Sequence, residues 1–319
     1  MRAPELPWLV ADIGGTNARF GLVTAPGAAP SHVAVLSGAV YPTLPDAVAA
    51  YLSEHAGGVR PGAACLAVAG PIDGDRYRLT NSPWAGSTRD LDVPYVKLLN
   101  DFEALAVSLP HLRADELVPL GGPEPSYGVK AVLGPGTGLG VGGLVPTDHG
   151  WVPIPGEGGH VTVPAADDRE LEIVRALRAE GLDQVVAEHV LSGPGLARLH
   201  RALARVNGVA APSLAASEIV ARLGDPLCAE TVEVFCGMLG SFAGNVALTL
   251  GARGGVYLGG GVLPRIVERV CASNFRARFA TNPDMSAYLA EIGTSLIVAP
   301  QPALTGAAAW LTQHAPAAR

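Results

Sequence analysis

Short apolar runs along the chain stop at glycine or at an acidic or amide side chain. They have the length of buried strands and occur at residues 8–11, 20–23, 64–69, 96–99, 131–133, 141–145 and 255–258. The first two runs enclose a polar turn, and the runs at 131–133 and 141–145 enclose a glycine-rich turn. Strand, tight turn and strand predict a hairpin in both places.

Apolar residues at helical spacing separate these strands. The pattern predicts helices at residues 102–109, 170–180, 184–191, 196–206, 229–250 and from 264 onward. Ser192 and Pro194 precede the fourth of these and suit a helix start. Strands that alternate with helices predict an α/β protein.

The length of 319 residues suggests two domains, and proline, glycine and charge gather at residues 110–125 as they do at a domain boundary. We predict a small α/β domain of residues 1–111 plus 302–319 and a large α/β domain of residues 112–301.

The two predicted hairpins resemble each other. GGTNARFGLV at residues 14–23 aligns without gaps with GTGLGVGGLV at residues 136–145. Glycine-turned hairpins can look alike for no further reason; the alternative is two copies of one α/β unit that face each other across a cleft. A nucleotide phosphate chain between two such turns would meet backbone N–H groups from both sides.

Charge and cysteine content exclude several classes of protein. The formal net charge is −7 and no block of Lys or Arg occurs, which disfavours a nucleic-acid partner. The four cysteines lie far apart without metal-ligand spacing, so they read as buried apolar residues in a reducing compartment. The first seven residues lack the apolar stretch of a signal peptide, and we expect a cytoplasmic protein without a membrane span.

The turn after the first strand carries candidate ligands for phosphate and metal. Gly14 and Gly15 let backbone amides approach an anion closely, and Thr16 and Asn17 add side-chain donors. Asp12 ends the strand and can bind Mg²⁺ directly or through water. An ordinary Asp–Gly hairpin is the alternative interpretation.

The glycine-rich turn contains two misleading features. Gly138, Gly140 and Gly143 match the dinucleotide fingerprint GxGxxG, but that fingerprint opens a helix, whereas the chain here stays strand-like up to Pro146. The Walker pattern is absent, and the two lysines of the chain lie in neither glycine turn. Phosphates bound here would therefore meet amides, hydroxyls and a metal.

Asn100 and Asp101 follow a predicted strand and precede a predicted helix. An Asp in this place is often only a helix N-cap. The alternative is a general base that accepts the proton of a substrate hydroxyl, since an Asp of ordinary pKa is ionised at pH 7.

Glu157 and His160 stand among three glycines in the loop PGEGGH. The cysteines supply no third ligand for a zinc site, whereas an acceptor and a donor side by side suit a polyhydroxylated ligand. Glu188, taken alone, reads as a solvated helix residue. The three glycines at 259–261 offer a flat backbone surface for adenine or ribose, or form only a tight crossover turn.

The order of these segments resembles the bacterial glucokinase family, within the hexokinase, Hsp70 and actin-like ATPase superfamily. The segments that carry the resemblance span nearly the whole chain: ADIGGTNARFGLV (11–23), AVAGPIDGD (67–75), LTNSPW (79–84), LLNDFEALA (98–106), GPGTGLGVGGLV (134–145), PGEGGHV (155–161), EHVLSGPGL (188–196) and GGVYLGGGVLPR (254–265). The resemblance implies a two-domain α/β fold of the actin-like ATPase (ribonuclease H-like) type, with a central cleft that closes on the sugar. It also implies ATP:D-glucose 6-phosphotransferase activity with Mg²⁺, and a homodimer.

The resemblance further implies a role for each candidate residue. Asp101 would be the general base. Sugar hydroxyls would be bound by Asn81, Asn100, Asp101, Glu157, His160 and Glu188. ATP would be bound by Asp12, Gly14, Gly15, Thr16, Asn17, Gly136, Thr137, Gly138, Gly259, Gly260 and Gly261. Mg²⁺ would lie on Asp12, directly or through water.

Neighbouring classes of protein differ at definite points. The repressor, open-reading-frame and kinase class of sugar kinases follows its Glu-x-Gly-His element with a cysteine-rich zinc loop, and this chain has no cysteine between His160 and Cys228. A kinase of mannose or glucosamine, or one that uses polyphosphate or ADP, would share the sugar loops. A non-enzymatic sugar sensor would need neither Asp12 nor Asp101, and a sugar-responsive DNA-binding regulator would carry a helix–turn–helix segment ahead of Trp8, where we find none.

Overall fold

The computed structural model describes residues 5–314. The first four residues, part of the segment in which we expect no signal peptide, and the last five of the predicted small domain lie outside this range. The chain divides into two compact units. Unit 1 contains residues up to 113, residues 147–153 and residues from 299 onward; unit 2 contains residues 114–146 and 154–298.

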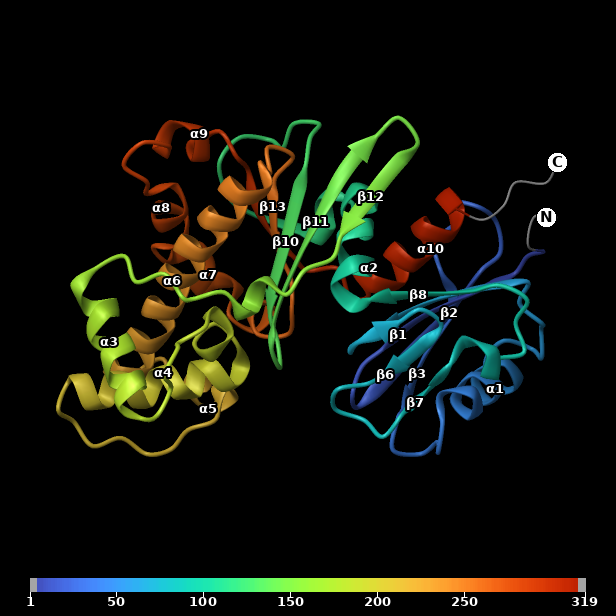
Figure 1. Ribbon diagram of the computed structural model, residues 1–319, viewed down its shortest axis with the longest axis horizontal. Helices are drawn as coiled ribbons and strands as arrows, with labels where there is room; N and C mark the ends of the chain where they lie inside the picture. The colour runs from blue at the N-terminus through green and yellow to red at the C-terminus, as the bar shows by residue number, and fades with distance from the viewer. Residues whose placement is uncertain (1–4, 315–319) are drawn as a thin grey trace. The chain divides into compact units, whose positions relative to one another are not determined.

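Unit 1 is built, within the described residues, on a sheet with the strand order β3-β2-β1-β4-β8 (Figure 1). Its strands are β1 (Trp8–Ile13), β2 (Asn17–Val23), β3 (Ser31–Ser37), β4 (Ala63–Val68) and β8 (Val96–Asn100). Its helices are α1 (Leu44–Glu54), α2 (Asp101–Ser108) and α10 (Pro302–His314). A small sheet of β5 (Ile72–Asp73), β6 (Arg76–Arg78) and β7 (Ala85–Ser87) follows β4 in the chain.

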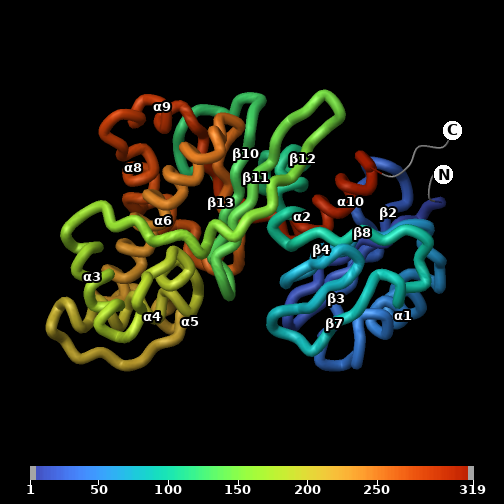
Figure 2. Tube along the Cα trace, in the orientation of Figure 1, coloured from blue at the N-terminus to red at the C-terminus, as the bar shows by residue number. Residues whose placement is uncertain are grey.

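The helices α1 and α10 of unit 1 pack on its central sheet. The buried side of α1 packs on the sheet, where the rings of Phe20 and Tyr51 stack with centroids 5.1 Å apart. Helix α10 comes from the far end of the chain and lies beside β1, β4 and α2 (Figure 2). A side chain at Gly306 would overlap the carbonyl of Ala104, so this glycine allows α10 and α2 to approach closely. The C-terminal helix therefore supports the helix that begins at Asp101.

Unit 2 contains, as far as the chain is described, most of a sheet with the order β12-β11-β10-β13-β14-β9; residue 147 of β11 and residues 150–153 of β12 belong to unit 1. Its strands are β9 (Leu117–Gly121), β10 (Lys130–Pro135), β11 (Leu139–Thr147), β12 (Gly150–Ile154), β13 (Val256–Leu258) and β14 (Thr294–Ile297). Its helices are α3 (Asp168–Ala179), α4 (Gly193–Val206), α5 (Ala216–Ala221), α6 (Pro226–Leu250), α7 (Val267–Ala272), α8 (Phe275–Ala280) and α9 (Ser286–Ala290).

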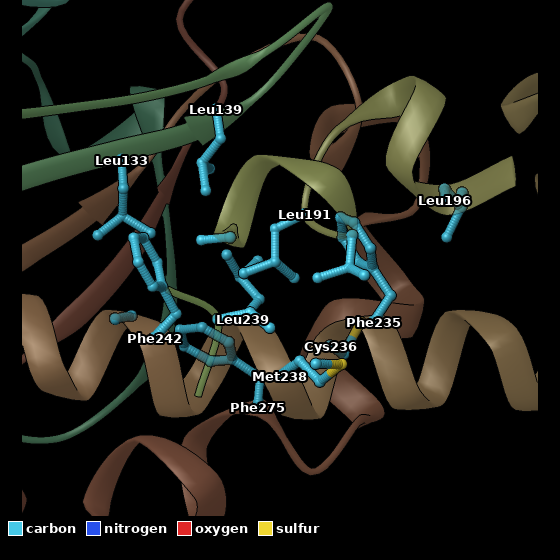
Figure 3. Close-up of a cluster of buried hydrophobic side chains, with 14 of the residues drawn as sticks. Leu133, Leu139, Leu191, Leu196, Phe235, Cys236, Met238, Leu239, Phe242 and Phe275 are labelled. Atoms are coloured by element: carbon cyan, nitrogen blue, oxygen red, sulfur yellow. The ribbon is translucent and has the colours of Figure 1, made fainter. Parts of the chain in front are cut away.

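The long helix α6 forms the centre of the core of unit 2. Its length and composition would suffice to cross a membrane, but 72% of its most apolar window is buried inside the protein. Phe235, Leu239 and Phe242 extend from it toward Leu133 and Leu191 (Figure 3). Packing in the core accounts for the apolar character of this helix.

The two sheets repeat one arrangement. β1 pairs antiparallel with β2 and parallel with β4, and β10 pairs in the same way with β11 and β13. The next strand, β8 or β14, is parallel in both sheets. This confirms both predicted hairpins, and it favours two copies of one α/β unit over a chance likeness of two glycine turns. The gapless alignment is wrong by one residue at the turns, since Ile13 pairs with Ala18 whereas Pro135 pairs with Leu139.

Two helix predictions are wrong in unit 2. Residues 184–191 form only a 3₁₀ turn at Ala187–His189, because this segment pairs with residues 161–163. The amide of Ala187 donates to the carbonyl of Val161 at 2.8 Å. The helix expected from Pro264 is a 3₁₀ turn at Leu263–Arg265, and α7 begins only at Val267. Tertiary pairing overrides local helical spacing in the first case.

Candidate functional site

Three of the predicted site residues of unit 1 lie at one edge of its sheet: the general base Asp101, the sugar ligand Asn100 and the metal ligand Asp12. β1, β4 and β8 are parallel, so their carboxyl ends share an edge. Asp12 stands one residue before the end of β1, and Asn100 ends β8 with Asp101 directly after it. In open α/β sheets, ligands bind at this edge.

Helix α2 begins at Asp101, and Asn100 caps it. The side-chain oxygen of Asn100 accepts the amide of Phe102 at 2.9 Å, while Glu103 Oε2 accepts the amide of Asn100 at 2.8 Å. This is a capping box, and it corrects the interpretation of Asp101 as the N-cap. Sequence reasoning missed Glu103, although an Asn followed three residues later by Glu was the signal for it.

Asp101 is an unusually basic carboxylate. Burial raises its pKa to about 6, the amide of Phe102 opposes this rise, and the nearby carboxylate of Asp12 adds to it. Its Oδ1 accepts the amide of Phe102 at 3.0 Å. The group is still mostly ionised at pH 7, and it accepts a proton more readily than an exposed Asp does.

Asp12 forms an ion pair across the first hairpin. Arg19, its partner in the strand register, donates from Nη1 to Asp12 Oδ2 at 3.2 Å. Burial raises the pKa of Asp12, and Arg19 opposes this rise. Sequence reasoning missed Arg19, which the hairpin register could have identified. No group of three or more His, Cys, Asp or Glu suited to a metal occurs within residues 5–314.

The first glycine turn has free amides next to a predicted sugar ligand. The amide of Gly14 closes the turn by donating to the carbonyl of Asn17 at 3.0 Å. The amides of Gly15 and Thr16 have no acceptor in the part of the chain that is described. A Cβ on Gly15 would lie 2.6 Å from the Cβ of Asn81, so packing as well as anion approach requires glycine here.

The second glycine turn repeats this pattern in unit 2. The amide of Gly136 donates to the carbonyl of Gly138 at 2.8 Å, and the amides of Thr137 and Gly138 meet no acceptor among the described residues. The amide of Leu139 donates to Glu188 Oε2 at 2.8 Å. The interpretation of Glu188 as a solvated helix residue is therefore wrong, because its carboxylate lies against the turn.

The three glycines at 259–261 differ in what surrounds them. The amide of Gly259 donates to the carbonyl of Leu133 at 2.8 Å. Gly260 has a φ of 81°, and a Cβ there would overlap the carbonyl of Pro135. Gly261 has open space around it. The first two fix this turn against β10, and the third leaves room for a ligand.

Glu157 and His160 extend from a short 3₁₀ turn with both side chains exposed. A Cβ on Gly158 would lie 2.8 Å from the Cβ of Val141, so this glycine lets the loop lie directly on β11. The pairing of residues 161–163 with 185–187 ties the loop to the segment that carries Glu188. Three predicted sugar ligands thus belong to one connected part of unit 2.

Known proteins share this fold and most of the chain. Residues 9–314 match the sequence profile of the Glucokinase family. A glucokinase from Saccharophagus degradans is 46% identical over 96% of this chain and 98% of its own. The crystal structure of a glucokinase from an Antarctic psychrotroph has a TM-score of 0.88 at 38% identity, covering 96% of this chain and 98% of that one. A Streptomyces griseus glucokinase of the ROK family, solved with glucose and AMPPNP, shares the fold, with a TM-score of 0.62 at 20% identity, covering 95% of this chain and 98% of that one.

Proposed function

The chain belongs to the glucokinase family, and on that premise we propose how its own residues carry out the ATP-dependent phosphorylation of glucose. The enzyme is an ATP:D-glucose 6-phosphotransferase of the α/β actin-like ATPase fold, as expected from the sequence. The observation that carries the assignment of roles is the partly buried carboxylate of Asp101, whose pKa is raised to about 6 at the edge of the sheet where ligands bind.

Asp101 acts as the general base. It orients the 6-hydroxyl of glucose and accepts its proton as the hydroxyl oxygen bonds to the γ-phosphorus of ATP, while the bond from that phosphorus to the β,γ-bridging oxygen breaks and ADP leaves. A base works best when its pKa lies near the operating pH, which is the effect of its burial and of the Asp12 charge. Asn100 caps the helix through its side-chain oxygen, so its NH₂ group is available to a sugar hydroxyl.

The two glycine turns bind the phosphates of ATP. Each turn has two amides without an acceptor among residues 5–314, Gly15 and Thr16 in one and Thr137 and Gly138 in the other. Such amides are good donors to phosphate oxygens. The remaining turn residues, Gly14, Asn17 and Gly136, shape these turns, and Gly259, Gly260 and Gly261 lie on the adenosine side.

Asp12 holds Mg²⁺, directly or through water. One of its oxygens is bonded to Arg19, and the other has no protein donor within residues 5–314. Mg²⁺ keeps most of its waters and takes one or two carboxylates together with phosphate oxygens, so this single carboxylate suits it without a preformed cluster. When bound, the ion neutralises charge on the transferring phosphoryl group.

Asn81, Glu157, His160 and Glu188 bind sugar hydroxyls together with Asn100 and Asp101. Groups built to bond a hydroxyl stay unpaired when an analogue lacks it, which can give discrimination of about 10⁴–10⁵. Rates measured with glucose, mannose, glucosamine and fructose, and with ATP, ADP and polyphosphate as donors, test both substrates. A preference for fructose or for polyphosphate would contradict the assignment.

Replacement of Asp101 is the most direct test of the proposed mechanism. Asp101→Asn should lower kcat by about 10²–10⁴, the usual contribution of a general base, with little change in ATP affinity. Asp92→Asn, at an exposed position of the same unit, is the matched control and should leave kcat unchanged. A kcat within about twofold of the wild type in Asp101→Asn would remove this residue from the role of base.

Cellular location, assembly and domain limits are further parts of the proposal. We assign the enzyme to the cytoplasm. We also assign it a homodimeric state, and light scattering can test the homodimer. The domain limits after residues 111 and 301 stay a prediction, and limited proteolysis can test them.

A further inference from the structure

The segment of residues 188–193 holds both ends of the second glycine turn. At one end, the amide of Leu139 donates to Glu188 Oε2 at 2.8 Å. At the other end, the amide of Gly193 donates to the carbonyl of Gly136 at 2.8 Å. A carboxylate acceptor makes the first of these bonds charge-assisted and therefore stronger than the second.

The 188–193 segment is itself fixed. Ser192 Oγ donates to the carbonyl of Glu188 at 2.8 Å and accepts the amide of Gly195 at 2.9 Å. Ser192 is thus the N-cap of α4, as the sequence predicted, and it ties Glu188 to the start of that helix. Both anchors of the turn consequently belong to one rigid element.

The carboxylate of Glu188 lies directly on the backbone of the turn. A Cβ on Gly138 would be 2.5 Å from Glu188 Oε2, a distance at which one of the two must move. Only glycine at position 138 permits this contact. Glu188 Oε1 receives no hydrogen bond from any described residue, so it is open to a ligand.

We propose that Glu188 positions the ATP-binding turn as well as binding the sugar, and so couples the two substrates. The inference rests on the proposed function, in which Thr137 and Gly138 bind phosphate and Glu188 binds a sugar hydroxyl. A sugar hydroxyl that donates to Oε1 restrains the carboxylate, and the restrained carboxylate holds the amide of Leu139 through Oε2. Glucose therefore tightens nucleotide binding, and by linkage the nucleotide tightens glucose binding by the same factor.

The test is the Kd of AMPPNP measured by calorimetry without sugar and then with saturating glucose. Without sugar, Glu188→Ala should raise the Kd of AMPPNP about tenfold, because the amide of Leu139 loses a charged acceptor. In Glu188→Gln the Kd of AMPPNP should stay within about twofold of the wild-type value, since the side-chain amide oxygen of Gln can accept the same bond. In Glu188→Ala, saturating glucose should no longer lower the Kd of AMPPNP.

Glu157→Ala is the matched control, because Glu157 is a second proposed sugar carboxylate of unit 2 that makes no hydrogen bond to the turn. Glu157→Ala should weaken the binding of glucose, and it should leave the Kd of AMPPNP measured without sugar unchanged. If Glu188→Ala fails to fold, Gly138→Ala replaces it. Its methyl group should displace the carboxylate and weaken both ligands.

The outcomes separate the positioning role from the proposed function. If Glu188→Ala loses glucose affinity and keeps the wild-type Kd for AMPPNP, the positioning role is overturned and the sugar role stands. If it loses AMPPNP affinity and keeps glucose affinity, the positioning role stands and the assignment of Glu188 to the sugar fails.

Discussion

Asp12 lies close enough to Asp101 in unit 1 for the charge of one carboxylate to act on the other. Burial is the larger cause of the rise in the pKa of Asp101 to about 6, and the Asp12 carboxylate raises it further. Burial raises the pKa of Asp12 too, while the ion pair with Arg19 opposes that rise and favours its charged form. The hairpin ion pair therefore helps to maintain the negative charge that makes Asp101 more basic.

This relationship predicts the acid limb of the pH profile. With glucose and MgATP both well below their KM, the rate reports the ligand-free enzyme and should fall as the pH decreases through about 6, because a protonated Asp101 cannot accept a proton. Asp12→Asn removes a like charge, so its acid limb should move to lower pH in addition to any loss of rate. Rates measured between about pH 4.5 and pH 8 test this, and an acid limb near pH 4 in the wild type would contradict it.

Asp101 should also lower the stability of the folded protein. Its pKa is raised in the folded state, so the folded state binds the proton more tightly, and stability falls as the pH rises from about 4 to about 6. Above about pH 6 the ionised Asp101 lowers the free energy of unfolding by its full amount. Asp101→Asn should therefore be more stable than the wild type at pH 8, by about 1–3 kcal/mol, while it loses activity.

Urea unfolding at pH 8 and at about pH 4.5 measures this difference, and most of the gain should be lost at the lower pH. Asp92→Asn, exposed and in the same unit, should show no gain at either pH. A loss of stability in Asp101→Asn at pH 8 would mean that its contact with Phe102 outweighs the effect of burial.

The sequence could predict the strand ends and glycine turns because these signals are local. An apolar run that stops at Asp12 or Asn100 shows where a strand ends, and the repeated turn shows two related hairpins. The sequence did not show why a particular position must be glycine. Gly15 packs on Asn81 and Gly138 packs on Glu188, and neither contact follows from the residues beside it in the chain.

The surroundings of Glu188 illustrate what local pattern cannot give. Its partner, the amide of Leu139, is 49 residues away in the sequence, and no periodicity links the two. The segment around it has helical spacing, yet pairing with residues 161–163 takes its backbone out of a helix. Only the resemblance to a family placed Glu188 in the site, and the tertiary structure supplies the contact that local sequence lacks.

Two neighbouring glycines should respond differently to the same substitution. Gly260→Ala should destabilise unit 2 by about 1–3 kcal/mol or more, since the residue has a φ of 81° and the methyl group would overlap the carbonyl of Pro135. Gly261→Ala should fold like the wild type, because nothing surrounds it, and should raise KM for ATP if adenosine lies there. Thermal unfolding and KM for both variants decide this; equal stability of the two would refute the packing argument.

The buried ion pair between Arg278 and Glu170 should be the most sensitive point of unit 2. Glu170 is 2% exposed; its Oε1 accepts Nη2 of Arg278 at 2.6 Å, and its Oε2 accepts the amide of Ala166 at 2.7 Å. Arg278→Ala leaves this carboxylate buried without its partner, which typically costs about 3–5 kcal/mol. The double variant Arg278→Ala with Glu170→Gln should recover part of the loss, because the amide carries no charge.

An exposed ion pair gives the comparison for this prediction. Arg222→Ala breaks a pair with Glu218 whose two side chains are both about half exposed, and it should cost less than about 1 kcal/mol. Urea unfolding of the variants measures the contrast. Because Glu170 also fixes Ala166, six residues after His160 in the chain, we expect Arg278→Ala to raise KM for glucose more than KM for ATP. Equal costs for the buried and the exposed pair would show that water reaches Glu170 once Arg278 is removed.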